Sequence, residues 1–467
     1  MIRVQKIHFV GIGGVGMSGI AEILLDTGYD VTGSDIADNP TIHRLKDLGA
    51  VIHLGHRAEN VEEADAVVIS SAISPGNVEV LAARERGIPV VRRAEMLAEL
   101  MRLKYGIAIA GTHGKTTTTS LVAMVLTEGG IDPTVVIGGR LEQLGSGAKV
   151  GAGEYLVAEA DESDGSFLKL SPAVAVVTNI DDDHLDFYGD MGRLAATFGE
   201  FCNRVPFYGF ALLCSDDPRL RGIASLCSRR VVTFGLGEQA DYRADRIETT
   251  EEGSRFRILQ RGDEMAEVSL RLVGIHNVTN ALAAAAVGIE LGLEPAAVVA
   301  GLERFRGVDR RMQLKGKGPG ESPWRVYDDY AHHPTEITAT LAAARALARG
   351  GRLLVVFQPH RYSRTALLYE KLAAALTAAD RLWLLPVYPA GEEPREGVSS
   401  GLIAEALRLK GYSSFTEIEG DARAAAGEIA RILEPRDLLL TLGAGDVWKI
   451  GEEILRLSAV RPERKSA

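Results

Sequence analysis

The chain has 467 residues, more than one compact hydrophobic core usually holds, so two or three domains are expected. Hydrophobic residues make up 46% and charged residues 25%, an ordinary globular balance, and the net charge of −11 argues against a basic nucleic-acid-binding surface. The three cysteines lack C-x-x-C spacing, so neither a disulfide framework nor a zinc site is indicated. Without a run of about eighteen apolar residues or a signal-peptide core, we expect a cytoplasmic protein with no membrane span.

The first expected elements are a strand over residues 6–10, the glycine-rich turn GIGGVG, a helix, and a second strand that ends at Asp35. The spacing G-x-G-x-x-G followed about twenty residues later by an acid is typical of a dinucleotide-binding turn. The turn itself indicates only a diphosphate at a helix N-terminus, so an NAD-dependent oxidoreductase and a nucleotide-sugar-binding domain both remain open. The expected strand AVVISSAI carries two serine hydroxyls at its end, which could bind phosphate or uridine. The candidate residues are Gly11, Gly13, Gly14, Val15, Gly16, Asp35, Ser70 and Ser71.

A second glycine-rich turn follows the strand GIAIA, after a domain boundary that we place near residue 103. A loop of the G-x-x-x-x-G-K-[ST] type would need a glycine where this chain has Ile109. Gly111 and Gly114 still allow a tight turn that aims backbone N–H groups at one point, and Lys115 can neutralise phosphate charge. A plain strand–helix turn is the alternative, but Gly-Lys-Thr-Thr directly after an apolar strand favours phosphate binding.

Two acidic clusters follow later strands of the same segment, VAEADESDGSF and TNIDDDHLD. Crowded carboxylates repel one another unless cations are near, and Mg²⁺ prefers oxygen ligands that it shares with phosphate. Either cluster alone could be a solvated acidic loop. Both of them at strand ends beside Gly-Lys-Thr favour an ATP–Mg²⁺ site. Their residues are Glu159, Asp161, Glu162, Asp164, Asp181, Asp182, Asp183, His184 and Asp186.

Alternating apolar strands and helices predict an α/β fold of three domains in series. We expect a Rossmann-like domain over residues 1–103, a central P-loop-type ATPase domain with a mostly parallel sheet over 104–314, and a Rossmann-like C-terminal domain over 315–467. An antiparallel patch is expected between residues 231 and 272. KGKGPGESP, residues 315–323, has the composition of a linker.

In the third domain, DDYAHHPTE and FQPHRYSRT each lead from a strand into a helix. Pro334 suits a first helical turn. Arg361 and Arg364 would share a helix face if the helix has begun there, and two guanidinium groups suit a carboxylate or an acyl phosphate. Surface arginines at a helix start are the alternative, although the positive end of a helix disfavours them.

The chain contains, in this order, GTHGKTT, the glutamate of VAEADESD, TNIDDDHLD, GIHNVTNALAA, GVDRRMQ and DDYAHHPTE. In these motifs and their order it resembles the Mur ligase family over essentially its whole length. The family's loop is spelled G-T-x-G-K-[ST]-[ST], which accounts for the short spacing before Lys115. GIGGVGMSG, DESDGSF and DDYAHHPTE together resemble the alanine-adding branch. Several relatives in the wider family carry a metal-supporting lysine about fifteen residues after the histidine, and the alanine-adding branch is expected to lack it. This chain has no lysine between Lys169 and Lys315.

The resemblance implies the following site roles. Lys115, His184, Arg311 and His332 are the implied catalytic residues, and Thr116, Glu159 and His184 would bind magnesium, as two ions. The implied ATP-binding residues are Gly111, Thr112, His113, Gly114, Lys115, Thr116, Thr117, Asn277, Asn280, Arg311 and Asp328. The implied amino-acid-binding residues are Tyr330, His332, Arg361 and Arg364, and the first domain would bind the UDP-sugar.

The implied activity is that of an ATP-dependent ligase, which joins L-alanine to the lactyl carboxylate of UDP-N-acetylmuramate through an acyl phosphate in peptidoglycan precursor synthesis. The expected partners are these small molecules, with no nucleic acid and no membrane, and the chain would act as a monomer or homodimer. A muramyl-peptide recycling ligase of the same family, an NAD-dependent oxidoreductase and a non-catalytic nucleotide-binding module are the alternatives. Only the first of these three shares the implied chemistry.

Overall fold

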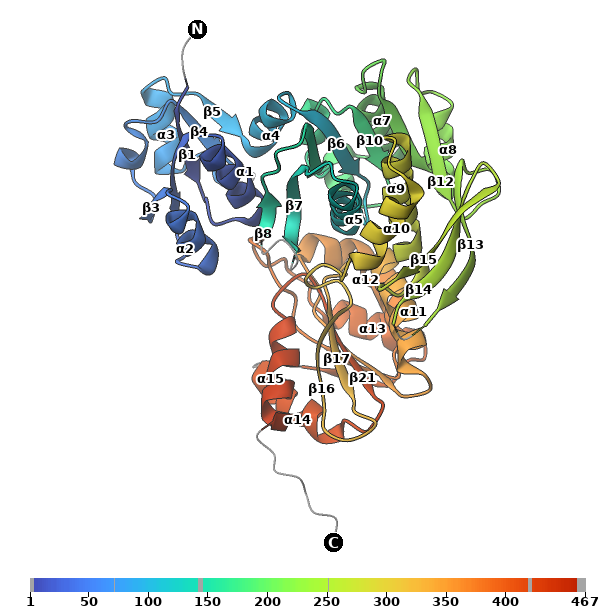
Figure 1. Ribbon diagram of the computed structural model, residues 1–467. Coiled ribbons are helices and arrows are strands. Elements are labelled where there is room, and N and C mark those ends of the chain that lie inside the picture. The colour runs from blue at the N-terminus through green and yellow to red at the C-terminus, as the bar shows by residue number, and fades with distance from the viewer. Residues whose placement is uncertain (1–3, 71, 142–145, 251, 419–421, 460–467) are drawn as a thin grey trace. The chain divides into compact units, whose positions relative to one another are not determined.

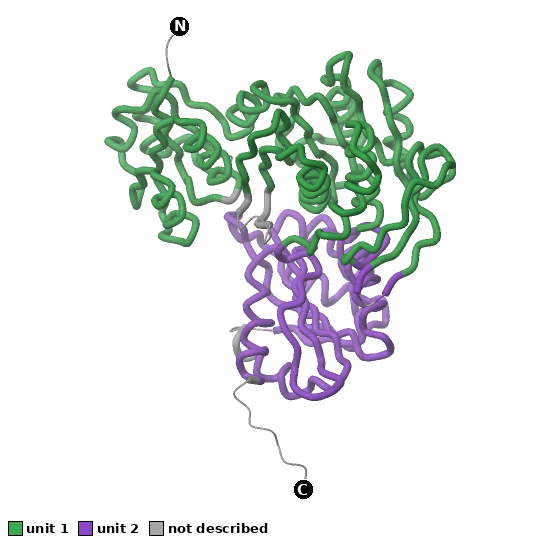
Figure 2. Tube along the Cα trace, viewed as in Figure 1, with its two compact units in different colours: residues 1–248, 254–272, 277–308 green, residues 249–253, 273–276, 309–467 purple. Residues whose placement is uncertain are grey.

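The computed structural model describes residues 4–70, 72–141, 146–250, 252–418 and 422–459. Figure 1 shows helices and strands that alternate along the chain, and the described strands form three sheets. The chain divides into two compact units, coloured separately in Figure 2. The first comprises residues 1–248, 254–272 and 277–308, and the second comprises residues 249–253, 273–276 and 309–467. The first unit holds two of the sheets, and the second unit holds the third.

The N-terminal sheet has the strand order β3-β2-β1-β4-β5, and all its paired strands are parallel. The strand order reverses at β1, and the glycine turn lies at the carboxyl end of that strand, where open α/β sheets bind ligands. The elements are β1 (Lys6–Val10), α1 (Val15–Asp26), β2 (Asp30–Asp35), α2 (Pro40–Asp47), β3 (Val51–Leu54), η1 (Ala58–Val61), β4 (Ala66–Ile69), α3 (Val78–Glu85), β5 (Val90–Arg92) and α4 (Arg93–Met101). The expected strand, turn, helix and second strand are confirmed.

The central sheet contains ten strands within the described residues, in the order β15-β14-β13-β12-β11-β10-β6-β9-β7-β8. Every residue of β10 and β11 is buried, as expected for parallel strands that are covered on both faces. The strands are β6 (Tyr105–Ala110), β7 (Thr134–Leu141), β8 (Ser146–Lys149), β9 (Tyr155–Glu159), β10 (Val174–Val177), β11 (Phe210–Cys214), β12 (Val231–Gly235), β13 (Tyr242–Thr249), β14 (Ser254–Gln260) and β15 (Asp263–Leu270).

The antiparallel patch expected between residues 231 and 272 is only partly present. β14 and β15 pair antiparallel, but β12 is parallel to both β11 and β13. The chain crosses over between β11 and β12 through α8 (Pro218–Ala224), so β12 returns in the direction of β11. The helical connection accounts for the parallel direction of β12. The alternation of apolar and polar side chains in the sequence does not indicate that direction.

Helices complete the first unit. They are α5 (Lys115–Glu128), η3 (Ser166–Lys169), α6 (Leu185–Tyr188), α7 (Met191–Asn203), α8, α9 (Ile275–Glu290), whose first two residues belong to the second unit, and α10 (Pro295–Arg304). The alanine-rich part of α9, residues 281–286, is completely buried, because small side chains let neighbouring elements approach from all sides. A Cβ added at Gly301 of α10 would lie 2.6 Å from the Cα of Val125 in α5, so the two helices pack backbone against backbone.

The C-terminal sheet has the strand order β16-β17-β21-β18-β19-β20, parallel except for the β16–β17 pair. Its elements are β16 (Gln313–Lys317), β17 (Arg325–Asp329), α11 (Pro334–Ala348), β18 (Leu353–Phe357), α12 (Tyr362–Leu376), β19 (Arg381–Leu384), α13 (Gly401–Leu409), β20 (Phe415–Glu417), α14 (Ala422–Ile432), β21 (Leu438–Leu442) and α15 (Trp448–Ala459). The three-domain α/β architecture agrees with the expectation.

The expected linker over residues 315–323 is wrong for its first three residues, which belong to β16. This strand pairs with β17 at the sheet edge with an irregularity next to Gly316, a position where a strand tolerates glycine. A Cβ at Gly316 would lie 2.8 Å from Leu455 Cδ2 of α15, so the glycine allows a close approach. The domain boundaries near residues 103 and 314 stay a prediction.

Two expectations drawn from the composition concern membrane spans and cysteines. None of the helices formed by the described residues is long and apolar enough to cross a membrane. Cys202 and Cys214 are buried free thiols, and Cys227 is half-buried.

Candidate functional site

The turn after β6 needs glycine at two positions. Gly111 has φ +123° and Gly114 has φ +84°, both in the region that side chains rarely adopt. A Cβ at Gly111 would lie 2.2 Å from Thr178 Oγ1, and one at Gly114 would lie 2.6 Å from Asn280 Oδ1. The turn is therefore closely surrounded, and its backbone leads into the N-terminus of α5, which favours an anion.

A segment after β10 holds this turn in place. Asn179 Oδ1 accepts a hydrogen bond from the His113 N–H (2.9 Å), and its Nδ2 donates to the His113 carbonyl (3.0 Å). Thr178 Oγ1 donates to the same carbonyl at 2.6 Å. The Thr112 hydroxyl accepts from the Asp181 N–H at 2.9 Å. These hydrogen bonds hold the backbone of the turn.

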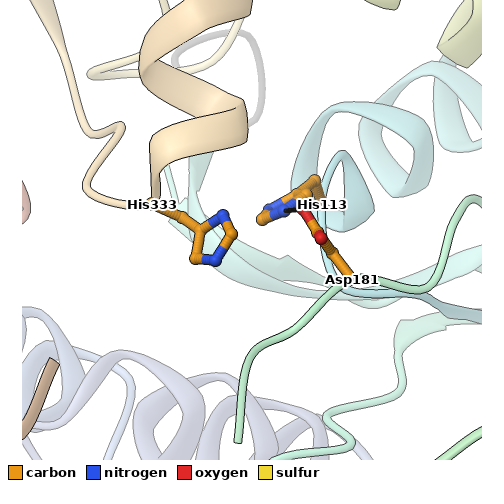
Figure 3. Close-up of side chains that lie close together, drawn as sticks. All are labelled: His113, Asp181 and His333. Carbon is orange, nitrogen blue, oxygen red and sulfur yellow. Dashed lines mark hydrogen bonds and ion pairs between the residues drawn. The ribbon is translucent and has the colours of Figure 1, made fainter. Parts of the chain in front are cut away.

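The His113 ring is also positioned by this segment. Its Nε2 lies 3.0 Å from Asp181 Oδ2, and Figure 3 shows the ring beside the carboxylate. His333, drawn in the same view, belongs to the second unit, where it is the N-cap of α11. Among the acidic residues of TNIDDDHLD, Asp181 therefore supports the glycine turn directly.

The Lys115 amine lies inside the turn. Its Nζ donates to the carbonyls of Gly111 (2.6 Å) and Thr112 (3.2 Å) and to both carboxylate oxygens of Glu162 at 3.0 Å. Burial alone would lower the pKa of Lys115, but the charges of Glu162 and Asp161 raise it above the ordinary lysine value. The amine is therefore held in the charged form that phosphate binding requires.

Carboxylates from the strand next to β6 face this amine. Glu159 ends β9 and is paired in register with Ile109 of β6, and its charge contributes to the raised pKa of Lys115. Asp161 is desolvated, which raises its pKa, but the Lys115 charge outweighs this effect and the pKa of Asp161 is lowered. With Thr116 in the first turn of α5, the site offers the oxygen donors that Mg²⁺ prefers.

His184 is the N-cap of α6 and has a left-handed φ of +58°. Its Nε2 lies 3.7 Å from Asp183 Oδ2. An imidazole nitrogen is a less usual magnesium ligand than a carboxylate oxygen, so its metal role stays a prediction.

Asn277 and Asn280 are buried on α9. Thr118 Oγ1 of α5 donates to Asn280 Oδ1 at 3.2 Å, and Asn280 Nδ2 donates weakly to Asn277 Oδ1 at 3.4 Å. Asn280 thus lies against the glycine turn and its helix. A contact of either side chain with adenine stays a prediction, as does the role of Thr117, which is buried in the first turn of α5.

The N-terminal glycine turn is held by the end of β2. The N–H groups of Gly11 and Ile12 donate to the Ser34 carbonyl at 2.8 and 3.0 Å. The carboxylate of Asp35 accepts from the N–H groups of Gly13 (2.9 Å) and Ala37 (3.0 Å). Asp35 therefore supports the turn through its carboxylate, and its contact with the sugar nucleotide stays a prediction.

The rest of this candidate site is placed as follows. Gly14 is the N-cap of α1 and Val15 is its first residue. Ser70 directly follows β4, and Ser71 lies outside the described residues.

In the second unit, Tyr330 and His332 lie beside one another with their ring centroids 5.5 Å apart, and His332 is 5.5 Å from His360. Arg364 Nη1 lies 3.5 Å from His360 Nδ1. Arg361 is the N-cap of α12 with φ +70°, so the helix begins one residue later than the shared-face argument requires. These residues form an aromatic and cationic group at the carboxyl ends of β17 and β18.

Arg311 and Asp328 are not paired with each other. Asp328 is fully buried, accepting from Arg310 Nε (3.0 Å) and from Thr441 Oγ1 (2.6 Å). Arg311 lies 3.9 Å from Glu336 and over the Tyr330 ring. The expected contacts of Arg311 and Asp328 with nucleotide stay a prediction.

No individual role could be assigned from the sequence to two residues that make central contacts in the structure, Glu162 and Asn179. Glu162 was one of several acids in its cluster, and Asn179 was only part of a motif. The available signal for Asn179 was its place two residues after the end of β10, a buried parallel strand that neighbours β6. The contact of Glu162 with Lys115 spans 47 residues of sequence, and no local pattern indicates it.

A parallel N-terminal sheet with a glycine turn, a central sheet with a Gly-Lys-Thr turn bordered by carboxylates, and a third α/β sheet define a multidomain α/β protein with the features of a phosphate-binding site. Family models match in the same order: "Mur ligase family, catalytic domain" over residues 6–105, "Mur ligase middle domain" over 109–288, and "Mur ligase, glutamate ligase domain" over 310–445. The chain belongs to the Mur ligase family, as the sequence motifs predicted.

Several relatives with high identity over nearly the whole chain bear the name of one ligase. The chain is 52% identical to a UDP-N-acetylmuramate–L-alanine ligase of Desulfosudis oleivorans, over 97% of this chain and 98% of that protein. It is 53% identical to the protein of that name from Geobacter sp. strain M21, over 98% and 99%. A UDP-N-acetylmuramate-alanine ligase structure from Thermotoga maritima has 30% identity and a TM-score of 0.81, over 98% of this chain and 100% of that one.

A murein peptide ligase from Psychrobacter arcticus has 25% identity and a TM-score of 0.72, over 98% of this chain and 100% of that one. The two ligase branches therefore share this fold. Membership of a ligase family also decides against the NAD-dependent oxidoreductase that the first glycine turn left open.

Proposed function

We propose that the chain catalyses the ATP-dependent joining of L-alanine to the lactyl carboxylate of UDP-N-acetylmuramate, a step of peptidoglycan precursor synthesis. The observation that carries this proposal is the Lys115 amine, held charged inside a glycine turn and faced by Glu162. Relatives that are 52–53% identical and bear the name of this ligase support the choice of substrates.

The reaction has two steps. The lactyl carboxylate attacks the γ-phosphate of ATP, which gives an acyl phosphate and ADP. The alanine amine then attacks the acyl carbon, and inorganic phosphate leaves as the amide forms. Lys115 and the N-terminus of α5 would offset the charge on the transferred phosphate, because positioning and electrostatics dominate phosphoryl transfer.

Thr116 and Glu159, together with His184, would hold Mg²⁺ in this scheme, as two ions. The oxygen donors fit a hard divalent cation, which would supply further charge neutralisation at the phosphates. His113, fixed by Asp181, would orient the turn.

The remaining assignments follow from the family resemblance. The turn from Gly11 to Gly16 would bind the diphosphate of the sugar nucleotide. Tyr330 and His332, with Arg361 and Arg364, would bind the amino acid through its carboxylate. We also propose that the chain works in the cytoplasm, as a monomer or homodimer.

A phosphate-release assay tests the proposal. Purified protein is given ATP and Mg²⁺ with each amino acid, with and without UDP-N-acetylmuramate. We expect phosphate release that requires both the sugar nucleotide and L-alanine. Release with an L-alanyl tripeptide in place of alanine would indicate the recycling ligase, and nucleotide binding without release would indicate a non-catalytic module.

The role of Lys115 has its own test. Lys115→Ala should abolish ADP formation while UDP-N-acetylmuramate still binds. Turnover at the wild-type rate would remove Lys115 from the mechanism.

A further inference from the structure

Two cysteines of the first unit meet although they lie on different elements of the fold. Cys202 is in the last turn of α7, and Cys227 follows α8. Their thiols interact directly with each other, and both thiols are free in the structure. The proposed ligase reaction uses neither of them.

The chain segments that carry the two cysteines are joined by hydrogen bonds one residue further on. The Oδ1 atom of Asn203 accepts from the N–H of Ser228 at 2.8 Å and from its hydroxyl at 2.9 Å. Asn203 Nδ2 donates to the Gly199 carbonyl of α7 at 3.1 Å, which fixes the orientation of this amide. The N–H of Cys227 donates to the Ile223 carbonyl of α8 at 3.1 Å. The backbone on both sides therefore holds the two thiols next to each other.

The two thiols differ in their access to solvent. Cys202 is completely buried, with 0% of its surface exposed. Cys227 is half-buried, and its neighbours in the chain, Leu226 and Ser228, are exposed. A small oxidant dissolved in water can therefore reach Cys227 first, while Cys202 lies behind it.

The two thiols also differ in acidity. The interaction with Cys202 lowers the pKa of Cys227 below its ordinary value, although partial burial acts in the opposite direction. The pKa of Cys202 is raised by the interaction with Cys227 and further by burial. Because the thiolate is the form that reacts with peroxides, Cys227 is the nucleophile of the pair. Cys214, at the end of β11, has its pKa raised to about 11 by burial, so we expect it to be inert.

We propose that Cys227 and Cys202 form a reversible redox pair, in which a hydroperoxide oxidises Cys227 and Cys202 then closes a disulfide. In the first step the Cys227 thiolate attacks a peroxide oxygen, the O–O bond breaks, and a sulfenic acid and water are formed. In the second step the Cys202 sulfur attacks the sulfenic sulfur, the Cys202 proton is lost, and the hydroxyl leaves as water. Two thiols and one hydrogen peroxide thus give one disulfide and two waters, and both electrons come from sulfur.

A resolving thiol protects a reactive cysteine. A sulfenic acid that condenses with a nearby thiol stays on the reversible part of the oxidation pathway, whereas an isolated one can proceed to sulfinic and sulfonic acids. In a reducing cytoplasm such a disulfide is transient, because cellular thiols reduce it. The inference is independent of the proposed ligase activity, since the oxidation needs neither ATP nor a sugar nucleotide.

Mass spectrometry of the full chain tests the pair. The reduced protein is exposed to hydrogen peroxide, and its remaining thiols are then alkylated, with and without prior treatment with dithiothreitol. Peptide mapping identifies the cysteines that are linked. The variants are Cys202→Ser and Cys227→Ser, and Cys214→Ser is the matched control. Thermal unfolding shows whether each variant is folded.

We expect the oxidised wild type to lose two hydrogen masses and to keep one thiol that can be alkylated, that of Cys214. Dithiothreitol should restore all three thiols. Cys214→Ser should form the same disulfide. Cys202→Ser should gain oxygen at Cys227, and Cys227→Ser should stay unoxidised at the same peroxide dose. The disulfide should raise the Tm of the wild type by roughly 5–10 °C, because it constrains the unfolded chain.

Three results would overturn the proposal. The first is wild-type protein that gains oxygen atoms without linking Cys202 to Cys227. The second is wild-type protein whose thiols stay intact at a peroxide dose that oxidises free cysteine. The third is a disulfide that lowers the Tm, because the two thiols would then have to leave their native positions to form it.

Discussion

Replacing Glu162 by Gln tests whether a charged contact holds the lysine of the central glycine turn. Glu162 is 1% exposed, and both its carboxylate oxygens lie 3.0 Å from Lys115 Nζ. Glutamine keeps the size and one carbonyl oxygen but loses the charge and one acceptor. Hydrogen bonds to charged groups contribute about 1.5–3 kcal/mol, and Lys115 keeps its two backbone acceptors, so we expect the unfolding free energy to fall by about 2 kcal/mol.

Thermal unfolding without nucleotide measures this loss. For a cooperative unit of 150–250 residues, about 2 kcal/mol corresponds to a fall in Tm of roughly 4–8 °C. Glu154→Gln is the matched control, because it makes the same chemical change at an exposed residue on the loop before β9. A Tm for Glu162→Gln equal to that of Glu154→Gln would refute the assigned contact.

Three further outcomes are expected. Gly114→Ala should weaken ADP binding and stability more than Gly130→Ala, because both glycines have positive φ but only the first would meet a neighbour, Asn280 Oδ1, at 2.6 Å; equal effects in the two variants would contradict this. Burial raises the pKa of Glu22 to about 7 despite a neighbouring arginine, so the folded state loses stability relative to the unfolded chain as pH rises from about 4.5 to about 7. The unfolding free energy of Glu22→Gln, compared with that of the wild type, should therefore be up to about 3 kcal/mol more favourable at pH 8 than at pH 4 in denaturant titrations. A difference between the two proteins that does not change with pH would contradict the raised pKa of Glu22. Arg364→Ala should raise the KM for alanine far more than that for ATP in the phosphate-release assay, and an unchanged alanine KM would remove the assignment.

The sequence predicted those features that depend on local chemistry. Buried parallel strands read as apolar runs, and positive-φ positions such as Gly111 and Gly114 require glycine, so both glycine turns were found in the right places. Pro334 was placed correctly as the first residue of a helix, where its missing N–H is no loss. The order of motifs also identified the family.

Features that depend on pairing across the chain were harder to predict. β16 lies in a glycine-rich stretch, and its pairing with β17 overrides that composition. The shared face of Arg361 and Arg364 was conditional on a helix that had already begun at Arg361, whereas the helix begins at Tyr362, after Arg361 with its positive φ. The Arg93 guanidinium meets Gly16 from a helix 77 residues later, and such an approach is visible only once both helices are placed.

The central claim is that a sugar-borne carboxylate attacks the ATP phosphate that Lys115 helps to hold. The most direct measurement uses UDP-N-acetylmuramate labelled with ¹⁸O in its lactyl carboxylate, with ATP and L-alanine, and determines the isotope content of the released phosphate by mass spectrometry. An acyl phosphate route transfers one labelled oxygen to each phosphate formed. Phosphate released without label, in step with amide formation, would contradict the account.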